Sequence, residues 1–182
     1  MKALAFAAAL LFATAAYAAD AEPPASTPGE QQALYTMRMF MDLCLTPQAD
    51  PQKVGEQAEK TGFRPLRPEA AKRFLGNAEG RAWAVQLAVG DWALTLDRQG
   101  VCTVWARKVD AKALEEVVSS WLPSRSTGFE TEPGQPTTTP NGLRTVVYSV
   151  HRGPAPYASW VLSTSPVDGA FFQGAVSLRM AK

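Results

Sequence analysis

The chain has 182 residues, a formal net charge of +1, and 46% hydrophobic and 19% charged residues. This length and composition are typical of one globular domain that can bury a real core. Because charges of both signs are interspersed, the charge balance gives no reason to expect binding to nucleic acid or to an anionic membrane surface. One histidine and two cysteines are too few for a zinc site, and we expect neither a metal nor another cofactor.

The first residues have the features of a secretory signal peptide. Lys2 supplies the positive charge, an apolar run covers residues 3–16, and Ala16-Tyr17-Ala18 is the small-residue pattern that a signal peptidase recognises. We therefore predict cleavage after Ala18 and a periplasmic or secreted protein of the Gram-negative type. The apolar run is too short for a transmembrane helix, which needs about 20 residues. The proline- and alanine-rich residues 19–30 predict a flexible leader.

Three helices are predicted next. Over residues 31–45 apolar side chains recur at helical spacing and place Cys44 on the buried face. Asp50 as N-cap and Gly62 as a stop delimit a short surface helix. A third short helix fits residues 68–75.

From residue 81 the apolar period changes to two, which predicts β-strands. Gly90-Asp91 fits a two-residue type II′ hairpin. This register gives three pairs that share one face: Val89 with Trp92, Leu87 with Leu94, and Val85 with Leu96.

The segment from Asp97 to Gly100 predicts a three-residue hairpin with a bulge at the glycine. It pairs Leu96 with Cys102 and turns Cys102 toward the apolar face, within reach of Cys44. Two cysteines in an exported chain are typical of a disulfide, and their wide separation does not match the C-x-x-C spacing of redox sites. We therefore predict a Cys44–Cys102 bridge rather than a redox or metal site.

The second half of the chain has one clear helix and a long irregular segment. Asp110 predicts the N-cap of a helix that Pro123 ends. Residues 123–142 contain four prolines and three glycines without a sustained period. Two interpretations stay open for this segment: a disordered excursion, or a binding loop with Phe129 at its tip. Three further strands are predicted, over residues 144–152, 157–164 and 170–180.

No catalytic constellation is visible in the sequence. The single histidine, His151, lies near a strand end, and no serine occupies a nucleophile elbow that it could activate. Glu115 and Glu116 fall on the polar side of a helix and are expected to be solvated. We therefore favour a non-catalytic protein over an enzyme without a recognisable motif.

Five tryptophans are many for this length. Trp83, Trp92 and Trp121 lie on apolar stripes and are predicted to be buried. Trp105 instead points away from Cys102 in its strand, which leaves two interpretations: a core residue, or part of a surface for a partner or ligand.

Five blocks of the sequence look familiar: FMDLCL, AEKTGFRPLRPEAAKRFLG, GRAWAV, GVCTVWA and VLSTSPVDGAFFQGAVSLRM. Through them the chain resembles a family of small, uncharacterised exported proteins and lipoproteins of Gram-negative bacteria, over about residues 37–180. The resemblance includes Cys44 and Cys102, which agrees with a bridge. This chain lacks the lipobox cysteine of the lipoprotein members, so no lipid anchor is expected. The resemblance implies a compartment and a fold but no activity.

We therefore predict a single α+β domain over residues 31–182, with N-terminal helices packed on antiparallel sheet, the strand order βββ-α-βββ and one disulfide. One six-stranded sheet and two smaller sheets both fit. The leading functional hypothesis is a non-catalytic periplasmic or secreted module that binds another envelope protein through Trp105 and the 123–142 segment with Phe129. The alternative is a binder of a small ligand or cell-wall glycan through a tryptophan-lined surface.

Overall fold

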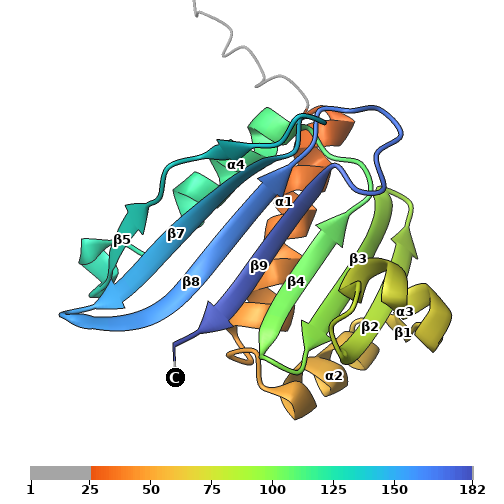
Figure 1. The fold of residues 1–182 in the computed structure, drawn as a ribbon, viewed down its shortest axis with the longest axis horizontal. Coiled ribbons are helices and arrows are strands. Elements are labelled where there is room, and N and C mark those ends of the chain that lie inside the picture. Colours follow the sequence, from red (N-terminus) through yellow and green to blue (C-terminus); the bar gives the residue numbers. More distant parts are fainter. Residues whose placement is uncertain (1–25, 182) are drawn as a thin grey trace, which may run out of the picture.

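The computed structural model describes residues 26–181, which form one nine-stranded antiparallel sheet with helices against both of its faces (Figure 1). The signal peptide predicted over residues 1–18 and the leader residues 19–25 lie outside the described residues. The mixed α+β class is confirmed. In the described part of the chain, no helix is long and apolar enough to cross a bilayer.

The elements follow one another in a mixed order along the chain. The helices are α1 (Pro28–Phe40), α2 (Pro51–Lys60), α3 (Pro68–Leu75) and α4 (Ala111–Trp121). The strands are β1 (Arg64–Pro65), β2 (Gly80–Leu87), β3 (Gly90–Asp97), β4 (Val101–Ala106), β5 (Glu130–Pro133), β6 (Thr137–Thr138), β7 (Arg144–Arg152), β8 (Ala155–Thr164) and β9 (Gly174–Met180). A π-helical turn, Met41–Leu45, continues α1, and a short 3-10 turn, Arg125–Thr127, precedes β5.

The last strand, β9, joins the two halves of the sheet because it lies between β4 and β8. The strand order is β1-β2-β3-β4-β9-β8-β7-β5, with β6 also paired to β7. The sheet is therefore single, which decides between the two arrangements that the sequence left open. The predicted order βββ-α-βββ is wrong, because the short strands β1, β5 and β6 add to it, and the helices are not confined to the N-terminal part. Strands of two to four residues are too short to show alternation, and they form where β2 and β7 offer a free edge.

The β2–β3 hairpin turns at residues 88–89, two residues before the predicted Gly90-Asp91 turn. Its register pairs Val85 with Trp92, so the predicted pairing is wrong. Gln32 of α1 donates a hydrogen bond of 2.8 Å to the Val89 carbonyl, which attaches the turn to the helix. Because the displacement is an even number of residues, every side chain keeps its predicted face.

The β3–β4 hairpin forms as predicted. The Asp97 carboxylate accepts two backbone N–H bonds of 2.9 Å across the turn, and Gly100 has a φ of 83°. Leu96 pairs with Cys102, and the predicted disulfide between Cys44 and Cys102 is present, with its Cα atoms 5.5 Å apart. The bridge fastens the π-helical end of α1 to the middle of the sheet.

Polar side chains cap the starts of α1, α2 and α4. Thr27 and Glu30 form a capping box, so α1 begins at Pro28, before the predicted start at residue 31. Asp50 and Asp110 cap α2 and α4 as predicted, each accepting backbone N–H bonds with its carboxylate.

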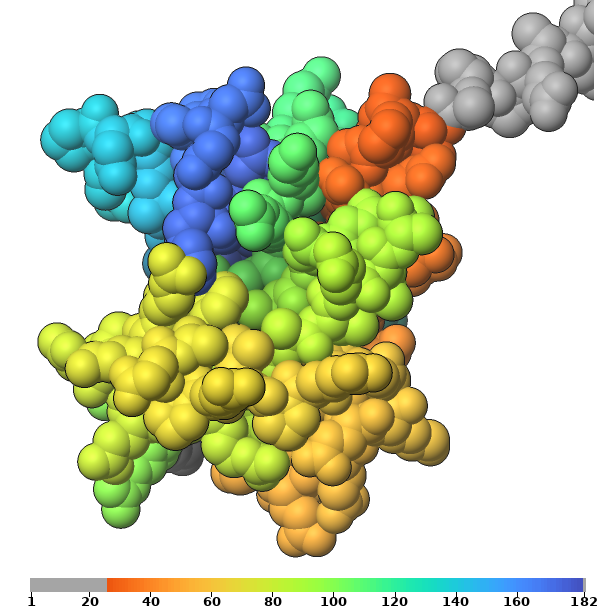
Figure 2. Space-filling view, turned by 90° about the vertical axis from the view of Figure 1, so that its right-hand side faces the viewer, coloured from red at the N-terminus to blue at the C-terminus, as the bar shows by residue number. Residues whose placement is uncertain are grey.

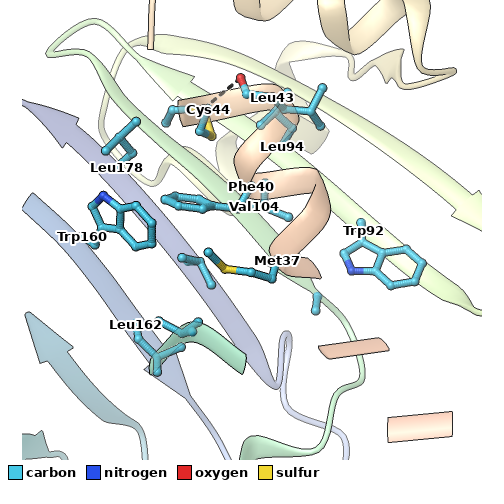
Figure 3. Close-up of a cluster of buried hydrophobic side chains, with 14 of the residues drawn as sticks. Met37, Phe40, Leu43, Cys44, Trp92, Leu94, Val104, Trp160, Leu162 and Leu178 are labelled. Carbon is cyan, nitrogen blue, oxygen red and sulfur yellow. Dashed lines mark hydrogen bonds between the residues drawn. A yellow bond between two sulfur atoms is a disulfide. The ribbon is translucent and has the colours of Figure 1, made fainter. Parts of the chain in front are cut away.

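The core lies on the sheet face that α1 and α4 cover. Figure 3 shows Met37 and Phe40 of α1 lying over the strands that carry Trp160, Leu178 and Val104. Phe40 and Trp160 meet edge to face with ring centroids 4.8 Å apart. Burying an aromatic side chain of this size removes about 150–250 Å² from water, worth roughly 4–6 kcal/mol at about 25 cal/mol per Å².

Two of the three predictions for buried tryptophans are confirmed. Trp83 and Trp92 are buried, and the Trp92 indole N–H donates to the Thr36 hydroxyl at 2.9 Å. Trp121 is 38% exposed, so its predicted burial is wrong. It is the last residue of α4, where the apolar stripe of the helix continues past the part that packs on the sheet.

Candidate functional site

The second face of the sheet is only partly covered. Helix α3 lies over the β2–β3 end of this face (Figure 1), and residues 169–172, just before β9, approach it from the other side. The rest of the face carries small polar side chains from β4, β7, β8 and β9. Two hydroxyl pairs are typical of it: Thr103 with Ser177 at 2.9 Å, and Thr145 with Ser163 at 3.1 Å.

Trp105 lies on this second face, opposite Cys102, as the strand alternation predicts. Its indole N–H donates to the hydroxyl of Thr95 at 3.0 Å, and the residue is half-buried. Phe74 of α3 lies 5.9 Å from the Trp105 ring, and Phe172 meets it edge to face at 4.7 Å. Trp105 is therefore a packing residue of this face and also the wall of an adjacent groove, and its part in binding stays a prediction.

The groove beside Trp105 has a volume of about 1110 Å³, and we call it the Trp105 groove. Its floor is a ladder of small side chains across the strands. Ala84 on β2 pairs with Ala93 on β3, and Ala93 pairs with Trp105 on β4. The two methyl groups leave open the space next to the indole. The edge strand β1 extends the same row, because Arg64 pairs with Ala84.

Three segments that are distant in the sequence enclose the Trp105 groove. In Figure 2 it is the hollow bounded by α3 in yellow, the segment before β9 in blue and the β2–β3 hairpin in lime green. Phe171 forms part of the rim, 4.8 Å from Phe74, and is 47% exposed. An aromatic side chain that is half exposed at the mouth of a groove is available to an incoming ligand.

The charged side chains that line the groove are mainly arginines. They are Arg64 on β1, Arg73 on α3 and Arg107 after β4, against a single acid, Asp91 on β3. Within residues 26–181, no ion pair closer than 4.0 Å involves any of these three arginines. The groove therefore combines an aromatic wall with a positively charged rim.

Phe129 is not part of this groove. It precedes β5, where its ring lies 4.8 Å from Tyr157 and the Arg152 guanidinium lies 6.0 Å from its centroid. Strand β5 is four strand spacings from β4, about 19 Å at about 4.8 Å per spacing. The structure thus places Trp105 and Phe129 on separate parts of the surface rather than on one.

Residues 123–142 are neither a disordered excursion nor a free loop with Phe129 at its tip. They form the 3-10 turn, β5 and β6, and both strands pair with β7. The Thr131 hydroxyl donates to the carbonyl of Pro123 at 2.7 Å and ties the segment back to the end of α4. Of the four prolines in this segment only Pro133 lies in a strand, and β5 is at an edge of the sheet, where a missing N–H does no harm.

The described residues contain no metal-binding cluster. Across residues 26–181 no three His, Cys, Asp or Glu side chains are grouped to hold a metal ion. His151 is half-buried and pairs in the ladder with Glu130. A hydrogen bond from Arg125, together with its charge, holds the pKa of the Glu130 carboxyl below its usual range. The Arg125–Glu130 ion pair lies at the surface.

Glu115 is not on a freely solvated helix face, which differs from the expectation. Its carboxylate lies 3.6 Å from the Arg144 guanidinium and accepts a hydrogen bond of 3.3 Å from the Thr164 hydroxyl. Both partners belong to strands, so Glu115 helps to attach α4 to the sheet.

Sequence reasoning did not find the aromatic partners of Trp105. Phe171 and Phe172 were assigned to a strand over residues 170–180, but β9 begins only at Gly174. The adjacent phenylalanines break the alternation of that strand, and this was the available signal. Phe74 lies in the helix predicted over residues 68–75, but its contact with Trp105 depends on how that helix packs on the sheet.

Comparison with protein-family models, with curated proteins and with solved structures found no match for this chain. The resemblance to exported proteins of Gram-negative bacteria therefore stays a prediction.

Proposed function

We propose that the chain is a non-catalytic, exported binding module that engages another envelope protein through the Trp105 groove. The observation that carries the proposal is the groove itself: a cavity of about 1110 Å³ whose rim has a half-exposed phenylalanine and three arginines without carboxylate partners. Tryptophan and arginine dominate the binding energy of protein interfaces, and aromatic residues in general are enriched in them.

The size of the groove favours a protein segment over a small molecule. Pockets for small molecules have volumes of about 300–1,000 Å³ and enclose most of the ligand. The Trp105 groove exceeds that range and opens along the surface (Figure 2). It is therefore suited to a short stretch of a larger partner.

The second candidate is a binder of a small ligand or cell-wall glycan. Trp105 supports it, because an indole beside a groove is a typical platform for a sugar ring. However, stacking requires a free indole face, and Phe74 and Phe172 already lie against Trp105. Trp83, Trp92 and Trp160 are buried, and of these three only Trp92 lines the groove, with 3% of its surface exposed. These observations make the glycan the weaker candidate.

Export is supported by the disulfide. Stable disulfides are typical of oxidising compartments and rare in the cytosol. The Cys44–Cys102 bridge joins two residues of 0% exposure, so it is a structural bridge of the core.

The test is site-specific photocrosslinking in living cells. A photoreactive phenylalanine analogue is placed at Phe171, on the groove rim, and in a second strain at Trp121, which is exposed on α4. The proposal expects one dominant protein adduct from position 171 and none of that mass from position 121. Equal adducts from both positions, or none from position 171, would show that the groove does not bind a partner protein.

A further inference from the structure

The charge arrangement of the Trp105 groove bears on what kind of segment it binds. Outside the groove the described arginines are divided: Arg81, Arg98, Arg125 and Arg144 each have a glutamate oxygen within 4.0 Å, whereas Arg38, Arg67, Arg152 and Arg179 do not. The three arginines of the groove have none. A salt bridge to an exposed guanidinium contributes little free energy in water. Several guanidinium groups without carboxylate partners nevertheless raise the local positive potential.

The groove is more positive than the chain as a whole. Its lining has three arginines and one aspartate, a formal charge of +3 − 1 = +2, whereas the whole chain has +1. Asp91 forms no ion pair within 4.0 Å with a groove arginine, and its hydrogen bond with Arg107 joins backbone atoms, the Arg107 N–H donating to the Asp91 carbonyl at 3.1 Å. The excess of positive charge is therefore located where the aromatic side chains are.

The arginines are spread along the groove rather than gathered at one point. Arg64 stands in the same cross-strand row as Trp105, three strand spacings away, or about 14 Å at about 4.8 Å per spacing. Arg107 lies two residues beyond Trp105 on the same side of the strand, and Arg73 stands on α3, with its guanidinium 6.0 Å from the Phe171 ring. An extended peptide covers about 14 Å with roughly four residues.

We propose that the Trp105 groove binds an acidic, extended segment of an exported partner protein. Carboxylates of the segment pair with Arg64, Arg73 and Arg107, and an apolar side chain between them contacts Phe171 and Trp105. This inference rests on the proposed function and adds the chemistry of the partner. Arginine suits the role because its planar guanidinium forms paired hydrogen bonds with a carboxylate.

A lipid headgroup or a free phosphate fits the arrangement less well. A single phosphate is held by donors that converge on it, whereas these arginines come from three elements along the length of the groove. The aromatic wall between them requires an apolar group placed between charges. A peptide with spaced carboxylates and one large apolar side chain meets both requirements.

The experiment uses the full chain, exported through its own signal and purified with its disulfide intact. Phage-displayed random octapeptides are selected on it, and the enriched peptides are resynthesised and titrated by fluorescence anisotropy. The groove-blocked control is Ala84→Phe, which fills the floor of the groove on β2, beside Ala93. Phe171→Ala is a second groove variant, which removes a half-exposed ring from the rim. The charge variants are Arg64→Gln, Arg73→Gln and Arg107→Gln. Arg179→Gln is the matched control, because Arg179 is exposed on the same sheet face outside the groove.

The proposal expects enriched octapeptides that contain several Asp or Glu residues and a large apolar residue. Each groove Arg→Gln change lowers their affinity about three- to tenfold, and Arg179→Gln changes it by less than about twofold. Raising the salt from about 50 mM to about 500 mM weakens binding to the wild type and has a smaller effect on the arginine variants.

Three results would overturn the inference, and they separate it from the proposed function. If the enriched peptides lack carboxylates but bind the wild type and not Ala84→Phe, the groove is the binding site and the inferred preference for acidic segments is wrong. Enriched peptides that bind wild type, Ala84→Phe and Phe171→Ala equally would remove the groove as the binding site as well. Arginine-dependent binding of phosphatidylglycerol vesicles or of peptidoglycan fragments, without peptide enrichment, would replace the peptide by that ligand.

Discussion

Removing the disulfide is expected to lower the free energy of unfolding by about 4 kcal/mol. The bridge joins Cys44 to Cys102, which are 58 positions apart in the sequence. In the chain-entropy model, cross-linking a loop of n residues lowers the entropy of the unfolded chain by about 2.1 + 1.5R ln n cal/mol/K, which gives about 4.2 kcal/mol at 25 °C for this loop. The test variant is Cys44→Ala/Cys102→Ala.

The double variant is expected to fold. Helix α1 is also held to the sheet by noncovalent contacts, such as the edge-to-face pair of Phe40 and Trp160 and the bond from Gln32 to the β2–β3 turn. The loss should therefore appear as a lower midpoint of one cooperative transition. For a domain of this size, about 2–4 °C per kcal/mol gives a drop of about 8–16 °C in Tm.

The assay is urea unfolding followed by tryptophan fluorescence, with wild type and variant compared at equal concentration. The slope of the free energy against urea should increase in the variant, because its unfolded chain exposes more surface without the cross-link. A loss below about 1 kcal/mol would refute the loop-entropy reasoning. Alkylation is the control for the bridge itself: labelling of both Cys44 and Cys102 in protein taken from cells without reductant would show that no bridge forms there.

Three further predictions concern local features of the fold. Gly174→Ala should lower the free energy of unfolding by about 1–3 kcal/mol, because an added Cβ would lie 2.5 Å from Leu114 and 2.6 Å from Val109. Thermal unfolding measures the loss. If adding Val109→Ala to this variant does not restore part of the stability, the steric cause is wrong. Asp110→Ala should cost about 1 kcal/mol, since the carboxylate accepts the Ala113 N–H at 2.7 Å, and an Asp110→Asn variant should keep most of that stability. Glu130→Gln should lower stability slightly near neutral pH. Because the folded-state pKa of Glu130 is depressed, the stability that its carboxylate contributes is present above the ordinary glutamate pKa and disappears as the pH falls through the depressed value. A difference in stability between wild type and variant that grows on acidification would contradict this expectation.

The elements that depend on neighbouring residues could be predicted from the sequence. The Asp50 and Asp110 caps and the Gly100 hairpin use local chemistry that a sequence displays directly. The disulfide followed from the same reasoning, because the hairpin register determines which face Cys102 occupies. Alternation also placed Trp105 on the opposite face correctly.

The features that depend on distant parts of the chain could not be predicted in this way. The β2–β3 turn at residues 88–89 accepts a hydrogen bond from Gln32, a residue far away in the sequence that local turn chemistry does not include. Strands β1, β5 and β6 exist only as partners of β2 and β7. The exposure of Trp121 could not be predicted either, because periodicity identifies the apolar face of a helix but not where the sheet beneath that face ends.

The candidate site is the clearest example of this limit. Trp105 gains Phe172 as a neighbour, and Phe171 joins the same cluster through Phe74 and Phe172, because β9 lies next to β4 in the sheet and brings the end of the chain to its middle. Phe74 arrives from α3, which covers the same face. Arg64, Arg73 and Arg107 are ordinary surface arginines in the sequence, and their association is a product of the tertiary fold.

The central claim is that the Trp105 groove holds a partner protein. The most direct measurement is the yield of the photocrosslinked adduct from position 171 in cells, with and without the Ala84→Phe change that fills the groove, at equal levels of folded protein. If the groove is the binding site, the filled variant loses most of the adduct while its Tm stays close to that of the unfilled protein. An undiminished adduct from the filled, folded variant would show that the partner is held elsewhere and would contradict the claim.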